Sequence, residues 1–188
     1  MRFLRQVIPD VVVIEVDFNG DDRGYFAETF RQDLLNDFLG YEVNFIQDNE
    51  SMSSKGVLRG LHYQIPPFAQ SKLVRVTQGE VLDIAVDIRK GSPTYGKHVA
   101  VNLSSENNKQ IFIPQGFAHG FLVKSESATF VYKVDNYYSS LHERGLKYND
   151  KKLNINWDIF NTQLSLSQKD LNQPLLKEMK DYFDFYKN

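Results

Sequence analysis

The stretch from Gln47 to Lys72 carries the side chains best suited to chemistry. It places Arg59, His62 and Lys72 among short apolar runs. An unperturbed imidazole titrates at about pH 6.5, which suits proton transfer near neutral pH. A cluster of cations is costly when it is partly buried without a purpose. A histidine on a strand is more often structural, but these neighbours favour His62 as a base in a pocket that binds an anion.

The strand expected around His62 has no cleanly apolar face. Residues 57–63 follow the strand period of two, with Arg59 on one register and His62 on the other. Two prolines then end the strand, because proline has no backbone donor. A strand that bears a histidine and ends at a rigid turn, with a lysine beyond it, predicts the wall of a polar pocket.

A second histidine, His119, lies in the segment I-P-Q-G-F-A-H-G-F, residues 113–121. Its Pro-x-Gly-x-x-His pattern resembles the second half of the cupin signature, in which that histidine often binds metal. A metal cupin also has two histidines and a glutamate in its first half. Here His62 stands alone, followed by Tyr63 and Gln64. Since a transition-metal site needs three or four ligands, we expect no metal.

Spacing alone does not decide whether four further residues have a structural or a functional role. Tyr132 alternates with apolar residues on one strand face, which is typical of a core tyrosine. Asp170 follows Ser167 at the spacing of a capping box, so it could simply cap a helix. Arg23 and Glu28 fit a surface turn and a solvated strand charge equally well.

Many short strands predict an all-β fold. We expect strands over residues 11–18, 25–30, 45–51, 57–64, 73–77, 81–88, 98–103, 109–113, 117–123 and 129–134. A Gln-Gly turn predicts that 73–77 and 81–88 form a hairpin. Residues 81–88 have one fully apolar face and one that carries Asp83 and Asp87. Without helices long enough to join parallel strands, these strands favour an antiparallel sandwich or barrel.

Helices are expected to be short and mainly C-terminal. One is predicted at 33–39, ended by a glycine. The segment from Ser167 to Asp170 predicts a short capped turn, and Pro174 is expected in the first turn of a helix that runs to Tyr186. The chain is expected to be a single domain, 1–188, with its core at about 10–136 and loops and a helix at 137–188.

Composition excludes several classes of protein. The net charge is −2 and no stripe of Lys or Arg is present, so we expect no nucleic-acid partner. The absence of Cys rules out disulfides and thiolate zinc sites. The N-terminus lacks the apolar run of a signal peptide, and no segment approaches the roughly 18 apolar residues of a membrane span. We therefore expect a soluble, cytoplasmic protein that does not bind a membrane.

Strings found in order from about Arg23 to Leu176 resemble the dTDP-4-dehydrorhamnose 3,5-epimerase family, which are metal-free cupins. They include R-G-Y-F-A-E-T-F-R, Q-D-N, K-G-V-L-R-G-L-H-Y-Q, Q-S-K-L-V-R-V, I-P-Q-G-F-A-H-G-F, Y-K-V-D-N-Y-Y, E-R-G and L-S-Q-K-D. The resemblance implies a jelly-roll homodimer that uses no cofactor. It also implies conversion of dTDP-4-dehydro-6-deoxy-D-glucose to dTDP-4-dehydro-L-rhamnose, a step in dTDP-L-rhamnose biosynthesis.

The same resemblance implies a role for each candidate residue. A C4 ketone acidifies the protons at C3 and C5, so each carbon can be inverted through an enolate. By the family pattern His62 is the base, Asp170 orients its ring, Tyr132 delivers a proton to the opposite face, and Lys72 lies near the C4 oxygen. The residues that match positions for nucleotide, diphosphate and sugar are Arg23, Glu28, Gln47, Asp48, Asn49, Arg59, His119, Glu143 and Lys169, and Tyr138 matches the ring that stacks on thymine.

Alternatives to this function remain. Epimerases that act on a single carbon keep the His/Tyr pairing, whereas 3,4-ketoisomerases lack it in this arrangement. A metal-dependent cupin oxygenase would need the missing histidine pair. A non-catalytic cupin would bind dTDP without exchanging sugar protons with solvent.

Overall fold

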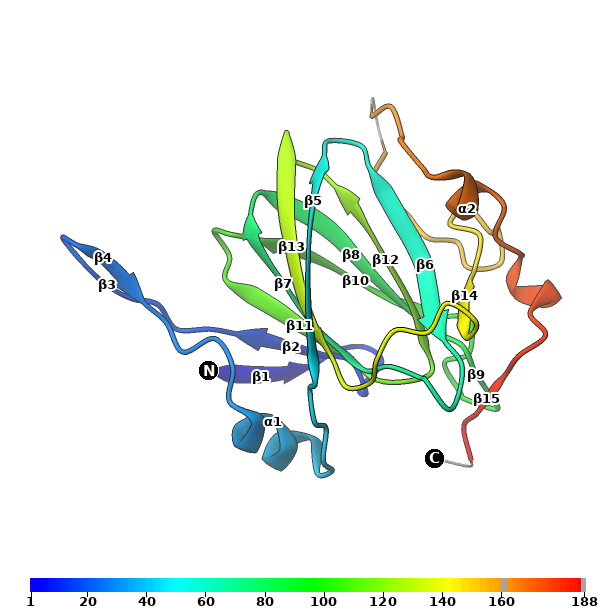
Figure 1. The fold of residues 1–188 in the computed structure, drawn as a ribbon, viewed down its shortest axis with the longest axis horizontal. Helices are drawn as coiled ribbons and strands as arrows, with labels where there is room; N and C mark the ends of the chain where they lie inside the picture. The colour runs from blue at the N-terminus through cyan, green and yellow to red at the C-terminus, as the bar shows by residue number, and fades with distance from the viewer. Residues whose placement is uncertain (160–161, 187–188) are drawn as a thin grey trace.

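Two antiparallel sheets pack against each other in the computed structural model, which describes residues 1–159 and 162–186 (Figure 1). The six-stranded sheet contains, in spatial order, β1 (Arg2–Arg5), β2 (Val12–Glu15), β11 (Lys109–Ile113), β7 (Lys72–Gln78), β13 (Ser127–Val134) and β5 (Gln47–Ser54). The five-stranded sheet contains β10 (His98–Ser104), β8 (Glu80–Asp87), β12 (Phe117–Val123), β6 (Leu58–Gln64) and β14 (Glu143–Gly145). The expected antiparallel all-β architecture with short helices is confirmed.

Alternating side chains from both sheets fill the space between them. Val74 of β7 and Phe130 of β13 belong to the same buried cluster as Ala85 of β8 and Phe121 of β12. The strand period of two sends the intervening residues outward. A polar cavity, described below, interrupts this apolar packing.

The C-terminal part of the chain covers the outer face of the five-stranded sheet. Leu82, Ile84 and Val86 of β8 pack there with Trp157 and Phe183. β8 therefore buries both of its faces, which accounts for its apolar composition on one side and its few, enclosed polar residues on the other.

The six-stranded sheet is partly covered on its outer face by α1 (Gln32–Leu39). Leu35 and Leu39 of this helix pack with Phe112 of β11. The helix ends as predicted at Gly40, whose φ of 82° is left-handed.

The predicted hairpin of residues 73–77 with 81–88 is wrong. A turn does join the two strands at Gly79, but β7 pairs with β11 and β13, and β8 pairs with β10 and β12. The chain crosses from one sheet to the other at this glycine, where a Cβ would lie 2.0 Å from the carbonyl oxygen of Ser127. In the five-stranded sheet, the outer face of β8 packs against the C-terminal part of the chain, so both of its faces are buried there.

The predicted helix from Pro174 to Tyr186 is also wrong. The short capped turn appears as α2 (Gln168–Leu171), but beyond it the chain forms only a 3-10 turn, η1 (Leu176–Glu178), and then β15 (Phe183–Asp184), which pairs in parallel with β9 (Arg89–Lys90). Leu176, Met179 and Phe183 are buried at helix-like spacing. An extended path brings these side chains to separate parts of the same apolar cluster, so tertiary packing overrides the local helical pattern.

A hairpin of β3 (Asn19–Asp21) and β4 (Gly24–Phe26) projects from the sandwich (Figure 1). It replaces the longer strand expected at 25–30, and its Tyr25 and Phe26 are 71% and 73% exposed. Among the described residues, no helix has the length and apolar character needed to cross a membrane.

Candidate active site

A cavity of about 310 Å³ lies between the two sheets. Strands of both sheets and α2 contribute to it. Its lining residues are Ser51, Arg59, His62, Lys72, His119, Gly120, Phe121, Phe130, Tyr132, Ser167, Lys169 and Asp170. The structure thus brings together the four predicted catalytic residues, which are separated by up to 108 positions in the sequence.

A bulge in β6 lets Arg59 and His62 share this cavity. His62 pairs with His119 of β12, whereas Arg59 pairs with Phe121, so three steps along β6 match two along β12. Such an extra residue reverses the side-chain alternation beyond it. The opposite registers expected for Arg59 and His62 are therefore wrong.

Glycine is required at the bulge. Gly60 has a φ of 120°, and a Cβ there would lie 2.5 Å from Cα of Gly120 on β12. The two backbones approach each other where neither strand carries a side chain. This close approach positions the His62 wall of the cavity.

His62 is paired with Asp170. Its Nε2 lies 2.6 Å from Oδ1 of Asp170, whose side chain is 4% exposed. Ser167 Oγ donates to Oδ2 of Asp170 over 2.8 Å and accepts from the Asp170 N–H. Ser167 thus caps α2 through the Asp170 N–H, while the Asp170 carboxylate contacts His62, so the capping spacing and the contact with His62 are compatible. Burial works to raise the pKa of Asp170, but hydrogen bonds from His62 and Ser167 outweigh it and lower the pKa below its ordinary value.

The opposite wall carries Lys72 and Tyr132. Lys72 is the register partner of Val134, two residues beyond Tyr132 on β13, so the two side chains share the inner face of the six-stranded sheet. Burial lowers the pKa of Lys72 to about 8, against the raising effects of Asp83 and Glu143. Burial, with help from Glu143, raises the pKa of the Tyr132 hydroxyl.

His119 lies beside His62 and has its own acidic partner. Its Nε2 is 2.9 Å from Oδ2 of Asp83, and the two side chains are 6% and 0% exposed. Burial lowers the pKa of His119, although Asp83 works against that shift. Asp83 was not among the predicted site residues. The sequence signal that could have identified Asp83 is its place on the less apolar face of residues 81–88. In the structure, that face lines the interior of the sandwich.

A connected set of polar residues extends from the cavity. Glu143 accepts a hydrogen bond from the Tyr138 hydroxyl at 2.8 Å and pairs with Lys169 at 2.5 Å. The Tyr138 backbone N–H donates to Gln47, whose side-chain nitrogen donates to Asn49. Five predicted binding residues therefore form one network that includes Lys169 of the cavity lining.

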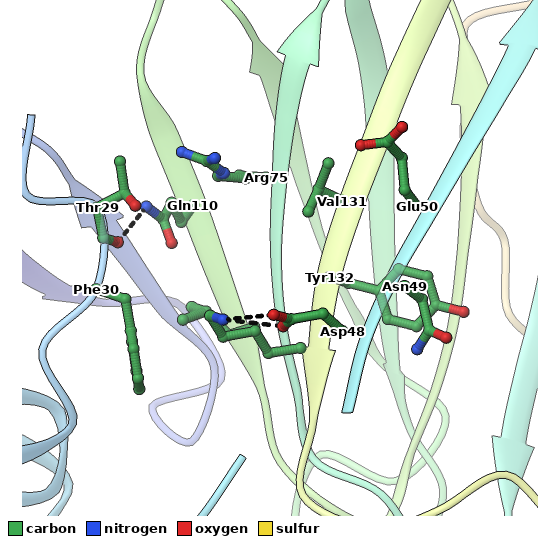
Figure 2. A pocket seen from close by; sticks show the side chains of 11 residues that line it. Thr29, Phe30, Asp48, Asn49, Glu50, Arg75, Gln110, Val131 and Tyr132 are labelled. Carbon is green, nitrogen blue, oxygen red and sulfur yellow. Dashed lines mark hydrogen bonds and ion pairs between the residues drawn. The ribbon is translucent and has the colours of Figure 1, made fainter. Parts of the chain in front are cut away.

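Three predicted binding residues lie elsewhere in this chain. Arg23 pairs with Asp21 on the projecting hairpin, and Glu28 lies near Arg31. Asp48 faces outward on β5 and binds Lys133 at 2.8 Å. Asp48 lines a different hollow on the outer side of the six-stranded sheet (Figure 2). This hollow has a volume of about 280 Å³. Arg23, Glu28 and Asp48 therefore do not line the cavity of their own chain.

Metal-ligand geometry is not found in the part of the chain that the structure describes. No group of three or more His, Cys, Asp or Glu side chains there is arranged to hold an ion. His62 and His119 each turn Nε2 to a separate carboxylate instead.

Comparison with known proteins places this site in a family. The sequence model described as dTDP-4-dehydrorhamnose 3,5-epimerase matches residues 5–178. The chain is 53% identical to the dTDP-4-dehydrorhamnose 3,5-epimerase of Shigella flexneri over 97% of its own length and 99% of that protein. A crystal structure of a 3,5-epimerase from Legionella pneumophila in complex with dTDP-4-keto-L-rhamnose is 46% identical, with a TM-score of 0.92 over 95% of this chain and 94% of that one. A 3'-monoepimerase from Streptomyces bikiniensis in complex with dTDP-quinovose is 32% identical, with a TM-score of 0.86 over 92% and 86% of the two chains.

Proposed function

The chain belongs to the dTDP-4-dehydrorhamnose 3,5-epimerase family and is an isomerase, and we propose that it inverts C3 and C5 of dTDP-4-dehydro-6-deoxy-D-glucose. The product is dTDP-4-dehydro-L-rhamnose, and the reaction needs no cofactor. Identities of 53% and 46% to the two 3,5-epimerases named above, against 32% to the 3'-monoepimerase, support action at both carbons.

The observation that carries this proposal is the placement of His62 and Tyr132 on opposite walls of one cavity. His62 comes from the five-stranded sheet and Tyr132 from the six-stranded sheet. Inversion requires removal of a proton from one face of a carbon and its replacement on the other face. A sugar bound between the two walls presents one face to each residue.

His62 acts as the base in this mechanism. Asp170 accepts the Nε2 hydrogen bond, which leaves Nδ1 as the ring nitrogen with a lone pair. Proton transfer from C3 or C5 to Nδ1 forms an imidazolium beside the buried carboxylate. Asp170 stabilises that cation and holds the ring in orientation.

Lys72 and Tyr132 complete the chemistry from the other wall. As a proton leaves the carbon, negative charge develops on the C4 oxygen, and the Lys72 ammonium stabilises it. A pKa of about 8 leaves Lys72 mostly protonated at neutral pH. The raised pKa of Tyr132 keeps its hydroxyl protonated until it donates to the enolate carbon.

The remaining cavity and network residues bind the nucleotide sugar. Arg59 is suited to the diphosphate because a guanidinium donates two parallel hydrogen bonds. Tyr138 stacks on the thymine ring, and Gln47, Asn49, His119, Glu143 and Lys169 contact the sugar nucleotide.

A homodimer reconciles the family pattern with the positions of Arg23 and Glu28. Both lie on or beside the exposed hairpin, outside their own chain's cavity. A second copy that receives the hairpin would bring them to substrate and cover Tyr25 and Phe26. Sedimentation velocity should give the mass of a dimer, and a monomer at micromolar concentration would contradict this part of the proposal.

The proposed reaction is tested by proton NMR in deuterated buffer containing a chelator. With dTDP-4-dehydro-6-deoxy-D-glucose, deuterium should enter at both C3 and C5. Trapping with a coupled reductase should give dTDP-L-rhamnose. Exchange at one carbon alone would show a single-carbon epimerase, and binding of dTDP without exchange would show a non-catalytic protein.

A further inference from the structure

Asp83 is a fully buried carboxylate with incomplete hydrogen bonding. Its Oδ2 accepts from Nε2 of His119, but Oδ1 has no hydrogen-bond partner among the described residues. A buried carboxylate oxygen without a donor destabilises a fold. Packing and stability therefore do not account for a charged residue at this position.

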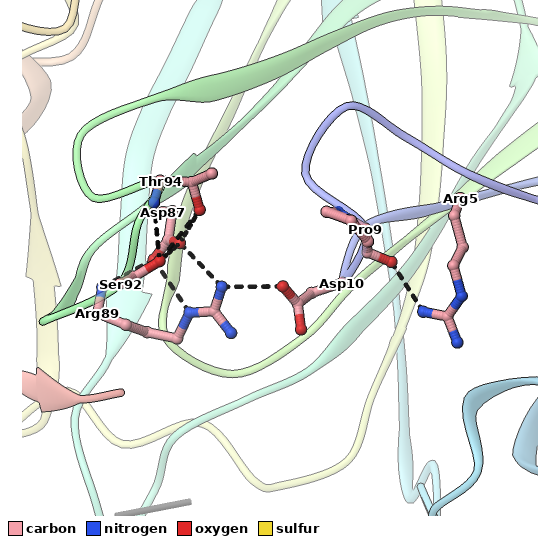
Figure 3. Close-up of polar contacts among 7 residues, drawn as sticks. All are labelled: Arg5, Pro9, Asp10, Asp87, Arg89, Ser92 and Thr94. Atoms are coloured by element: carbon pink, nitrogen blue, oxygen red, sulfur yellow. Dashed lines mark hydrogen bonds and ion pairs between the residues drawn. The ribbon is translucent and has the colours of Figure 1, made fainter. Parts of the chain in front are cut away.

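Asp87 provides the contrast, because it is equally buried on the same face of β8. Figure 3 shows Arg89, Ser92 and Thr94 gathered around its carboxylate. Both Asp87 oxygens accept from the Arg89 guanidinium, at 3.0 and 2.8 Å, and Oδ2 also accepts from the two hydroxyls at 2.6 Å each. Both carboxylate oxygens of Asp87 therefore have hydrogen-bond partners, within an ion pair with Arg89. One oxygen of Asp83 has none among the described residues.

Asp83 lies next to the active-site cavity. Its register partner on β12 is Phe121, which lines the cavity together with His119. Because an ionised carboxylate only accepts hydrogen bonds, Asp83 fixes the proton of His119 on Nε2. The other ring nitrogen, Nδ1, then remains as an acceptor for a ligand.

Lys72 is the cation in this cavity that lacks a direct partner among the described residues. No acidic oxygen of these residues lies within ion-pair distance of its ammonium, whereas Arg59 donates to the Ser53 hydroxyl and Lys169 pairs with Glu143. The ionisable groups around it are Asp83 of β8, Glu143 of β14, Arg59 and His62 of β6, His119 of β12, Tyr132 of β13, and Lys169 and Asp170 of α2. Asp83 and Glu143 are the two negative charges that favour its protonated form, and Asp83 has the larger effect.

We propose that Asp83 is a positioning residue of the epimerase: it orients His119 and supplies the negative charge that keeps Lys72 an ammonium where the C4 oxyanion forms. This inference rests on the proposed function. The Oδ1 of Asp83, which has no partner among the described residues, is consistent with this role, because a cationic partner there would offset the negative charge that acts on Lys72.

The direction of the pH effect follows from burial. Burial already lowers the pKa of Lys72 to about 8, although the charges of Asp83 and Glu143 act to raise it. Removing the Asp83 charge lowers that pKa further, so the ammonium is lost at a lower pH. Stabilisation of the oxyanion would then fail near neutral pH and return as the pH is lowered.

The direct test is Asp83→Asn, which removes the charge but keeps an oxygen that can accept from His119. The Lys72 side chain is titrated by carbon NMR of lysine-labelled protein without substrate, and its signal is identified by its loss in Lys72→Met. We expect the pKa of Lys72 to fall by at least about 1, as a nearby unit charge does at an effective dielectric constant of 20. An unchanged titration would overturn the proposal.

Asp87→Asn is the matched control. It should lower the melting temperature by breaking the Arg89 network while leaving the Lys72 titration unchanged. Asp83→Asn should keep the melting temperature close to that of the original chain, because it removes an incompletely bonded charge. A Lys72 shift of equal size in both variants would also overturn the proposal.

Deuterium exchange provides the second readout. In Asp83→Asn the alkaline loss of exchange should move to lower pH, whereas a loss equal at every pH would contradict a role through Lys72. The substrate-free titration separates this inference from the proposed function. If the unmodified chain shows no exchange, the function fails, but the titration still measures the effect of Asp83 on Lys72.

Discussion

Arg59 and His62 lie three residues apart on β6 and face the same cavity. The β-bulge between them makes this possible, and it depends on the close approach of Gly60 to Gly120. Without the extra residue, the strand period would turn one of the two side chains away from the cavity. The geometry of the site is therefore set by two residues that have no side chain.

A methyl group at Gly60 should disrupt this arrangement. Gly60→Ala would place a Cβ 2.5 Å from Cα of Gly120 at a φ of 120°. We expect the free energy of unfolding to fall by about 2 kcal/mol or more, because backbone strain and a backbone clash combine. Urea denaturation measures the change.

Gly40→Ala is the control for Gly60→Ala. Gly40 also has a positive φ, 82°, but a Cβ there would meet nothing within 4 Å. This variant should lose only about 1 kcal/mol, and epimerase activity should be retained. Equal losses in both variants would show that the Gly60–Gly120 contact has no special importance.

Tyr132→Phe should impair inversion more than proton exchange. The change removes the proposed proton donor of the six-stranded sheet but leaves His62 and Asp170 intact. Product formation should fall about 100-fold or more, in the range typical of a lost general acid. Deuterium should still enter substrate that keeps its original configuration, as judged by NMR. An equal loss of exchange and inversion would indicate that Tyr132 binds substrate or supports the fold instead.

Ser167→Ala should affect both stability and catalysis. Ser167 caps α2 through the Asp170 N–H and also donates to the Asp170 carboxylate. Losing the cap should cost about 1 kcal/mol of unfolding free energy. Losing the second hydrogen bond should lower kcat up to about tenfold with little change in KM, because it acts on the partner of His62.

Ser167→Thr separates these effects from a change in packing. Threonine keeps the hydroxyl, so it should restore most of the stability and of kcat. If kcat in Ser167→Ala equals that of the unmodified chain, Asp170 does not need Ser167 to hold its orientation.

The sequence was sufficient to predict the antiparallel architecture, and the four predicted catalytic residues do line one cavity. Specific physical causes explain the predictions that were wrong. The alternation of polar and apolar residues predicts the strands, but it cannot show that β7 and β8 enter different sheets, because a Gly-containing turn permits both paths. The spacing of Leu176, Met179 and Phe183 is helical, yet packing against the five-stranded sheet holds them in an extended chain. Local patterns do not encode these choices between tertiary partners.

Within the site, the same limit applies to individual residues. Spacing identified Asp170 as a possible cap, but its contact with His62 spans 108 positions. Asp83 was visible on one face of residues 81–88, yet only the fold shows that this face is internal and that His119 is its partner. Strict alternation placed Arg59 and His62 on opposite faces, which is wrong because of the bulge between them. The glycine is the only sign of this bulge in the sequence, since the alternation of polar and apolar residues does not reveal it.

The central claim is that one base on one wall serves both carbons, and His62→Ala tests it most directly. Proton NMR of this variant with dTDP-4-dehydro-6-deoxy-D-glucose in deuterated buffer reports C3 and C5 separately. Circular dichroism and dTDP binding should first show that the variant is folded and holds the nucleotide. We expect deuterium at neither carbon. Deuterium uptake at C3 or C5 at the rate of the unmodified chain would contradict the single-base mechanism.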